Sequence, residues 1–218
     1  MARLVGSVGK YAYGEKDGTA YCHLFAAGKV DFSNGISLEC RTDYPYRMSV
    51  KYDVTGSGKL AVRIPKWSRN YTLTVDGTEV TAAPENGYVY VAVNGNTQVE
   101  LLLDGTPRFV RASGRVPRLT GMTALMRGPL VYCFEGTDNG SVRELRIDRS
   151  VTPAVEEFDP DFLGGTTRLT AKAYRTEDCD DLYSSEPEEL TPCEATAIPY
   201  YAWGNRGENE MRVWLNVK

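Results

Sequence analysis

The stretch LTVDGTEV, Leu73 to Val80, carries the clearest folding signal in the chain. Its Asp76-Gly77 pair separates two short runs that are rich in apolar and β-branched residues. Because Asp and Gly both tolerate positive φ, this pair favours the two-residue turn of a β-hairpin. The stretch therefore predicts two antiparallel strands joined by a tight turn.

Alternating apolar and polar residues continue on both sides of this hairpin. Every second residue is apolar from Lys59 to Ile64, and residues 88–93 and 99–103 have the same period of two. The run Asn94-Gly95-Asn96 lies between the last two segments and predicts a second hairpin. Short strands between Gly, Pro and Asn signals are typical of an all-β protein.

A change from one set of strands to another near residues 104–107 predicts two domains. We expect two consecutive antiparallel β-sandwich domains, jelly-roll-like in form, at residues 15–105 and 106–218. The first is expected to contain strands near residues 21–25, 36–41, 48–52, 60–64, 73–75, 88–93 and 99–103. The second is expected to contain strands near residues 109–112, 123–127, 130–135, 168–174, 196–200 and 212–215.

Residues 1–14 are the only part of the chain that predicts a helix. The apolar residues on one face of this amphipathic helix are Leu4, Val5, Val8, Tyr11 and Ala12. Gly6 and Gly9 lie within it, and each costs about 1 kcal/mol relative to Ala. Because so short a helix needs packing partners, we expect it to be the end of a larger helical element.

The charge pattern argues against nucleic acid and membrane partners. The 218-residue chain has a net charge of −4 and no long basic run, whereas binding to phosphates needs clustered Lys and Arg. No apolar run reaches the roughly 20 residues of a membrane span. Glycines interrupt the first residues, where a signal peptide would have its apolar region.

Five cysteines are present, an odd number, and none forms a C-x-x-C pair of the kind found in zinc sites. Cys22, Cys40 and Cys133 lie in apolar strand-like runs, which predicts reduced thiols that act as small apolar side chains. Cys179 and Cys193 lie in a loop segment, and the sequence leaves open whether they pair. The reduced cysteines favour a cytoplasmic location, which is otherwise undetermined.

The residue types used in hydrolysis have structural explanations in this sequence. His23 is the sole histidine and alternates with apolar residues, which predicts a strand residue on a polar face rather than a catalytic base. Adjacent acids at Glu156-Glu157, Asp180-Asp181 and Glu188-Glu189 predict surface charge rather than the carboxylate pair of a glycosidase. Residues 177–194 carry eight acids and no base, which predicts a solvated loop.

The segment AIPYYAWGNRG, residues 197–207, concentrates aromatic rings next to an amide and a guanidinium. Such a group suits a sugar-binding surface, but it equally suits a structural corner that leads into the last strand. The candidate sugar-contacting residues are Trp67, Tyr201 and Trp203. As a corner, the segment should bury Tyr201 or Trp203, whereas two exposed rings side by side would favour sugar binding.

Five strings together resemble the C-terminal portion of glycoside hydrolase family 127, the β-L-arabinofuranosidase family. They are ARLVGSVGKYAYG (2–14), YPYRMSVKYDV (44–54), LAVRIPKWS (60–68), MRGPLVYCFEGTDN (126–139) and TAIPYYAWGNRGENEMRVWL (196–215). The resemblance covers essentially this whole chain but only the last third or so of a family member. It implies two β-sandwich domains that follow an α/α barrel.

The resemblance also implies that catalysis resides in the barrel. Family members are thought to retain anomeric configuration through a cysteine thiolate held on zinc, with a glutamate assisting. No catalytic or zinc-binding residue of the family carries over to a position in this sequence, so the resemblance implies no cofactor here and no activity. Cys22 follows the metal-binding segment and is not its counterpart.

Three roles are therefore compatible with the sequence. The first is a non-catalytic region that braces the barrel, with the barrel of the same polypeptide as its partner. The second is a carbohydrate-binding module for a plant-type arabinose-containing glycan. The third is an assembly surface for a homodimer. Nucleic acid and membranes are not expected as partners.

Overall fold

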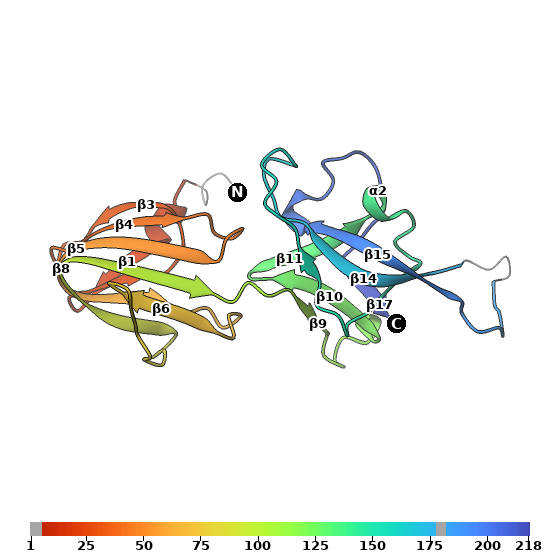
Figure 1. The fold of residues 1–218 in the computed structure, drawn as a ribbon, viewed down its shortest axis with the longest axis horizontal. Helices are drawn as coiled ribbons and strands as arrows, with labels where there is room; N and C mark the ends of the chain where they lie inside the picture. The colour runs from red at the N-terminus through yellow and green to blue at the C-terminus, as the bar shows by residue number, and fades with distance from the viewer. Residues whose placement is uncertain (1–5, 178–181) are drawn as a thin grey trace. The chain divides into compact units, whose positions relative to one another are not determined.

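The structure, a computed structural model, describes residues 6–177 and 182–218 and is shown in Figure 1. The chain divides into two compact units, Met1–Gly105 (unit 1) and Thr106–Lys218 (unit 2). Strands dominate both units, and the helices of the described residues are single short turns. The predicted all-β class with two consecutive sandwich-like units is confirmed.

Unit 1 contains one eight-stranded sheet. Its strands are β1 (Tyr13–Lys16), β2 (Thr19–Cys22), β3 (Gly28–Asp31), β4 (Ser37–Thr42), β5 (Ser49–Arg63), β6 (Tyr71–Val75), β7 (Thr78–Glu79) and β8 (Tyr88–Leu103). The order is β1-β2-β5-β8-β6-β7, with β3 and β4 attached beside β5. The β2–β5 pairing is parallel, which differs from the antiparallel prediction.

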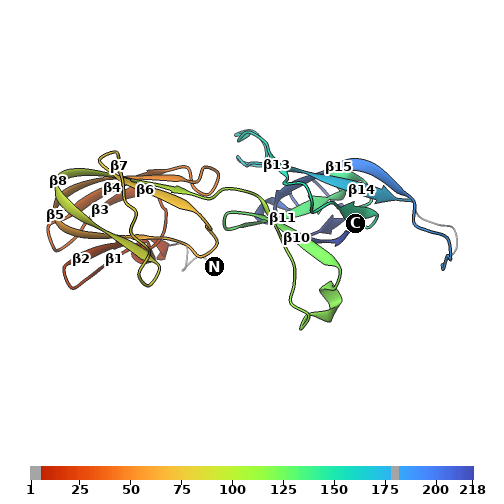
Figure 2. The same cartoon turned by 60° about the horizontal axis from the view of Figure 1, so that its bottom comes forward.

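The two long strands, β5 and β8, build both layers of unit 1. They pair from Ser49↔Leu102 to Arg63↔Tyr88, and Gly56 faces Gly95 in the middle of this ladder. One half of β5 pairs with β4 and the other half with β2, so that β1 and β2 lie on the opposite side of the unit from β4 and β6 (Figure 2). The sheet therefore folds over on itself and encloses its apolar face.

The second predicted hairpin, at Asn94-Gly95-Asn96, is wrong. These residues lie inside the continuous strand β8 and pair with β5 throughout. Gly95 has a φ of +74°, which bends the strand without reversing the chain. The hairpin at Asp76-Gly77 is confirmed, because Val75 pairs with Thr78 across two residues of positive φ.

Gly56 is required at the bend because no side chain fits there. Its φ is +116°. A Cβ atom at this position would lie 2.5 Å from the carbonyl oxygen of Gly35 and 3.1 Å from the Cα atom of Ile36. Backbone atoms cannot move aside as a flexible side chain can, so the loop before β4 packs directly onto the bend.

Apolar side chains from both layers form the core of unit 1. Tyr52, Leu60, Leu73 and Leu101 are among its largest fully buried residues. Cys22 and Cys40 are buried free thiols in the same core, as predicted. Burial of side chains of this size contributes about 1.5–3 kcal/mol each, which makes the enclosed face the main source of stability in the unit.

Unit 2 contains a nine-stranded sheet. Its strands are β9 (Arg108–Val110), β10 (Met122–Arg127), β11 (Leu130–Glu135), β12 (Leu145–Ile147), β13 (Ala154–Val155), β14 (Leu169–Thr176), β15 (Leu190–Pro199), β16 (Met211–Arg212) and β17 (Trp214–Val217). A short helix, α2 (Gly136–Asn139), follows β11, and 3₁₀ turns lie at Pro117–Leu119 and Tyr200–Ala202.

The strand pairings of unit 2 close on themselves. The path β11-β15-β14-β12-β17-β10 returns to β11 through the β10–β11 hairpin. Gly128 and Pro129 form the turn of this hairpin, and the φ of +54° at Gly128 fits a type II′ turn. The β12–β17 pair is parallel, which again differs from the antiparallel prediction. Leu125, Tyr132, Phe134 and other buried residues fill the enclosed space.

The prediction of an N-terminal helix needs correction. The N-terminal helix is a four-residue 3₁₀ turn, Val8–Tyr11, whose residues are not buried, while positions 4 and 5 of the predicted stripe lie outside the described residues. Gly9 within this turn explains part of the difference, since Gly disfavours a regular helix. Whether Cys179 pairs with Cys193, which the sequence leaves open, stays untested because Cys179 lies outside the described residues.

The acidic segment at 177–194 is only partly a loop. β15 begins at Leu190, which pairs with Thr176, and Glu194 lies opposite Lys172 in the neighbouring strand. Arg146 forms an ion pair with Glu188. The end of this acidic segment therefore pairs with β14 as a strand, although its composition alone predicts a loop.

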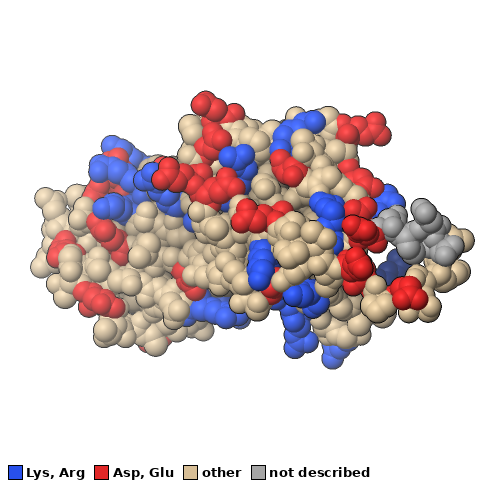
Figure 3. Space-filling model, turned by 45° about the vertical axis from the view of Figure 1, so that its right-hand side comes forward, with Lys and Arg blue, Asp and Glu red and all other residues tan. Residues whose placement is uncertain are grey.

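In the described part of the chain, no helix has the length and apolar character needed to cross a membrane. Acidic and basic residues are interspersed on the face drawn in Figure 3. This distribution agrees with the small net charge of −4.

The bend in unit 1 yields a stability prediction. Gly56→Ala should lower the free energy of unfolding by about 3 kcal/mol or more, because it combines strained backbone with a clash against backbone atoms. Gly95→Ala is the matched control: its φ is also positive, but nothing lies within 4 Å of the added Cβ atom. It should cost about 1 kcal/mol. Urea unfolding measures both, and equal losses would contradict the packing argument.

Candidate functional site

Two places in the structure gather polar and aromatic side chains, one in each unit. The first is a hollow in unit 1 of about 1020 Å³, which we call the His23 hollow. The second is the loop after β15, which we call the aromatic corner. They are described separately below.

The His23 hollow is assembled from four separate segments of unit 1. It is lined by residues 23–26 after β2, Tyr44 after β4, residues 63–67 after β5, and residues 86–88 at the start of β8. The pairing of Arg63 with Tyr88 brings the last two segments together, and the parallel β2–β5 pair places His23 beside them.

The imidazole of His23 is held by contacts on several sides. Its Nδ1 atom is hydrogen-bonded to the Tyr88 hydroxyl at 2.8 Å, and its ring stacks on Tyr21 with centroids 5.8 Å apart. A Cβ atom at position 14 would lie 2.6 Å from Nε2, so the imidazole can occupy this position only because residue 14 is glycine. Burial, and then the nearby charge of Arg63, lower the pKa of His23, which favours the neutral imidazole.

Aromatic side chains and two cations complete the lining of the hollow. Trp67 is half-buried against the core, and Tyr44 packs edge-on against Phe25 with ring centroids 5.0 Å apart. Burial raises the pKa of Tyr44 to about 12, so its hydroxyl stays protonated at neutral pH. Arg63 and Lys66 are both exposed, and Arg63 donates to the carbonyl oxygen of His23 at 3.2 Å.

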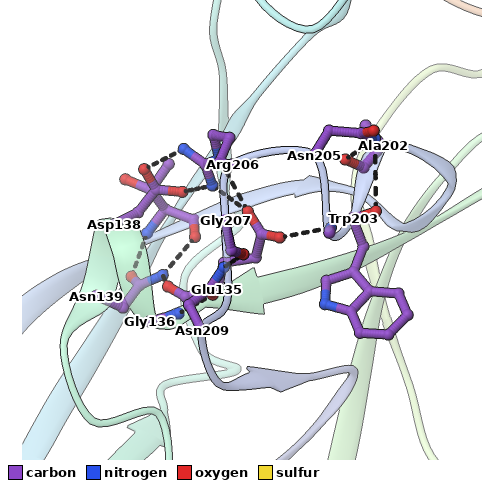
Figure 4. A network of polar contacts seen from close by, with 12 residues as sticks. Glu135, Gly136, Asp138, Asn139, Ala202, Trp203, Asn205, Arg206, Gly207 and Asn209 are labelled. Atoms are coloured by element: carbon purple, nitrogen blue, oxygen red, sulfur yellow. Dashed lines mark hydrogen bonds and ion pairs between the residues drawn. The ribbon is translucent and has the colours of Figure 1, made fainter.

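The aromatic corner of unit 2 rests on a buried ion-pair network, shown in Figure 4. The Glu135 side chain is fully buried, and its carboxylate accepts hydrogen bonds from Arg206 Nε at 2.9 Å and from the Gly204 backbone N–H at 3.0 Å. Arg206 also binds Asp138, with Nη1 to Oδ1 at 2.7 Å. The guanidinium thus links the end of β11 and helix α2 to the loop before β16.

Asn139 extends this network into the sheet. Its side-chain amide donates to the carbonyl oxygens of Glu135 at 2.8 Å and Thr196 at 2.9 Å, and it accepts from the Thr196 N–H at 2.9 Å. All of its hydrogen-bonding directions point to backbone groups of β11 and β15. The residue therefore fixes the corner and is not placed to contact a ligand.

The prediction that Tyr201 or Trp203 is largely buried is wrong. Tyr201 is 53% exposed and Trp203 is 45% exposed. The buried residues Cys133, Ile198 and Ala202 form the core beneath the corner, and Phe162 and Met211 rather than Tyr201 or Trp203 pack against it. The Trp203 ring points away from the Arg206 network in Figure 4.

Trp203 stacks on Tyr200 and not on Tyr201. Its ring is nearly parallel to that of Tyr200, at 8°, with centroids 6.2 Å apart. Tyr200 is also exposed and lines a shallow groove with Trp214 and Met211. The Tyr201 hydroxyl instead reaches Thr166 Oγ1 at 3.2 Å.

The three candidate sugar-contacting residues do not form one site. Trp67 lies in the His23 hollow of unit 1, whereas Tyr201 and Trp203 lie in unit 2, and Trp203 stacks on Tyr200. The sequence analysis missed Arg63 and Glu135. The alternating apolar residues around each of them predict a strand. They do not indicate which distant residue each side chain contacts in the folded unit.

The described residues do not fit the zinc site that the resemblance implies for longer relatives. No three His, Cys, Asp or Glu side chains within ranges 6–177 and 182–218 are grouped to hold a metal ion. Burial raises the pKa of Cys133 to about 12, and burial also raises the pKa of Cys22. These thiols are therefore protonated and poorly suited to bind a metal or attack a substrate.

Comparisons with known proteins agree along the whole chain. A model described as the glycoside hydrolase family 127 C-terminal domain matches residues 107–216, and a model described as the β-L-arabinofuranosidase GH127 middle domain matches residues 19–104. A non-reducing end β-L-arabinofuranosidase of Bifidobacterium longum subsp. longum is 40% identical over 234 aligned positions, which cover 98% of this chain and 36% of the relative.

Solved structures show the same relationship. A GH127 β-L-arabinofuranosidase from Geobacillus stearothermophilus T6 superposes with a TM-score of 0.93 at 32% identity, covering 100% of this chain and 36% of that one. A second GH127 β-arabinofuranosidase has a TM-score of 0.88 at 27% identity, covering 100% and 38%. This chain thus spans little more than a third of the length of these relatives.

The buried ion pair yields a second stability prediction. Arg206→Leu should destabilise the protein by about 3–5 kcal/mol, because it leaves the Glu135 carboxylate buried without its cation. Arg41→Leu is the control: its side chain is 63% exposed, so its solvent-screened ion pairs with Glu39 and Asp53 should add little to stability. Denaturant unfolding measures both.

A double variant separates charge burial from loss of packing. Glu135→Gln combined with Arg206→Leu should recover part of the stability lost in Arg206→Leu alone, since a neutral amide costs less to bury than a carboxylate. A double variant less stable than Arg206→Leu alone would refute this account of the network.

Proposed function

This chain belongs to glycoside hydrolase family 127, and on that premise we propose that it forms the non-catalytic β-sandwich region of a longer family member and braces its catalytic part. The observation that carries the proposal is the pair of domain matches. They account for residues 19–104 and 107–216 with a middle and a C-terminal domain, while the relatives are nearly three times as long, since the chain covers 36% of their length.

The chemistry of the described residues supports a structural role. His23 is engaged by Tyr88, and Glu135 is neutralised by Arg206. These contacts hold both side chains in place within the fold, which is what a structural role requires. We therefore assign hydrolysis of β-L-arabinofuranosides, the activity named for the relatives, to the part of the longer protein that this chain does not include.

Exposed apolar residues supply surface for such a bracing role. Tyr200, Tyr201 and Trp203 present three aromatic rings at one corner of unit 2, each about half exposed. Val8 and Tyr11 are 48% and 62% exposed near the beginning of unit 1. Apolar surface of this kind is typical of regions that contact another domain.

A chimera tests the bracing proposal. The matching region of the Bifidobacterium longum relative is replaced by this chain, and hydrolysis of an aryl β-L-arabinofuranoside and the thermal midpoint are measured. We expect activity within about tenfold of the parent, because the 40% identity preserves the fold. The relative without this region should lose activity or unfold at lower temperature, and a chimera carrying Arg206→Leu should unfold earlier than the intact chimera.

Two results would contradict the proposal. One is full activity and unchanged thermal stability of the relative when the region is deleted. The other is turnover of the aryl glycoside by this chain alone, tested with and without added zinc.

Carbohydrate binding is the second candidate function, favoured by one observation. The nearly parallel rings of Tyr200 and Trp203 are both exposed, and two exposed rings side by side are the arrangement expected of a sugar-binding surface, with Tyr200 in place of Tyr201. Aromatic faces of this kind stack on the C–H faces of sugar rings. The ligand would be a plant-type arabinose-containing glycan.

Calorimetric titration with arabinan and arabinogalactan oligosaccharides tests the second candidate. If the pair binds sugar, Trp203→Ala should weaken binding at least about tenfold, equivalent to about 1.4 kcal/mol. Tyr183→Ala is the control, because Tyr183 is 93% exposed and lies outside the corner. Absence of binding at millimolar oligosaccharide concentrations would reject this function for the corner.

A further inference from the structure

We propose that the His23 hollow of unit 1 binds a sugar ring that carries a carboxylate, such as a hexuronate residue of an acidic oligosaccharide. The choice of a sugar rests on the proposed place of this chain in a sugar-hydrolysing protein. The carboxylate of the ligand and the place where it binds are inferred from the side chains that line the hollow.

The hollow has the size and the construction of a small-molecule site. Its volume is about 1020 Å³, and all of its lining residues come from unit 1. Ligand pockets usually measure about 300–1,000 Å³ and combine apolar walls with a few polar groups. Here Trp67, Tyr44 and Phe25 provide aromatic walls, while His23, Arg63 and Lys66 provide the polar groups.

Uncompensated positive charge is the feature that selects an anion. Among the described residues, no Asp or Glu lines the hollow, and no carboxylate lies within ion-pair distance of Arg63 or Lys66. A guanidinium matches a carboxylate with two parallel hydrogen bonds, so Arg63 can hold the acid group of a ligand.

Arg63 is held in place before any ligand arrives. Its side chain donates to the carbonyl oxygen of His23 at 3.2 Å, and Arg63 is the last residue of β5, where it is paired with Tyr88 of β8. The ring of His23 is fixed in turn by its hydrogen bond to Tyr88 and by close packing against Gly14. Groups fixed in this way lose little conformational freedom on binding, which increases affinity.

The aromatic walls favour a ring over a short-chain acid. Trp67 and Tyr44 belong to segments on different strands, and both line the hollow. The contact between Phe25 and Tyr44 at 5.0 Å restrains the Tyr44 ring. A sugar ring that stacks on one of these faces can direct its carboxylate to Arg63 and a hydroxyl to the Asn86 amide.

Titration with galacturonic acid, glucuronic acid and short oligogalacturonides tests the proposal, with galactose and arabinose oligosaccharides as neutral comparisons. Binding is followed by calorimetry and by the NMR signals of His23, which is the only histidine in the chain. We expect the uronates to bind at least about tenfold more tightly than the neutral sugars, to shift the His23 signals, and to bind more weakly at high salt.

Variants locate the site. Arg63→Met should weaken uronate binding at least about tenfold, which is the loss expected for a charged hydrogen bond. Arg41→Met should not change it, because Arg41 is exposed but lies outside the hollow. Urea unfolding of each variant shows whether the fold is intact, and Lys66→Met, at an exposed position, provides a second substitution in the lining.

Three results would overturn the proposal. They are equal binding of neutral and acidic sugars, unchanged uronate binding in both Arg63→Met and Lys66→Met, and no shift of the His23 signals at about ten millimolar uronate, a concentration that detects even weak binding. None of these results bears on the bracing role, which the chimera tests independently.

Discussion

The continuous pairing of β5 with β8 is the constraint on which unit 1 depends. Both strands bend where Gly56 faces Gly95, so one ladder supplies both layers and sets the register of every strand attached to it. Because Arg63 pairs with Tyr88 at the end of that ladder, the same register places the lining of the His23 hollow. The bend and the hollow thus have one structural cause, and a shift of register by one residue would turn Arg63 to the opposite face.

Unit 2 is organised around a charge that the fold has to neutralise. Glu135 ends a buried strand, and its carboxylate would be costly in the core without Arg206, which lies 71 residues later in the chain. The ion pair therefore joins the end of β11 to the loop before β16. This loop belongs to the aromatic corner, which also contains Tyr200 and Trp203.

Strands and turns that depend on local residue patterns could be predicted from the sequence. Features that depend on contacts between residues far apart in the chain could not. Asp76-Gly77 and Asn94-Gly95 carry the same hairpin signal, yet the second lies in a bend because β5 continues to pair across it. The exposure of Trp203 was missed for a similar reason. Which rings pack inside depends on the cluster around Cys133, Ile198 and Ala202, which meet only in the folded unit. The His23 hollow, built from four segments, has no signature in any of them.

The distribution of charge separates structural residues from residues available for recognition. Arg206 is fully engaged by Glu135 and Asp138, and the exposed bases Lys29, Arg41 and Lys51 are paired across neighbouring strands. In a chain with a net charge of −4, acids are abundant enough to pair with further bases. Arg63 and Lys66 line the hollow beside aromatic walls, and neither is ion-paired with a described carboxylate. Ion pairing therefore does not account for these two charges, whereas binding of an anionic ring would use both.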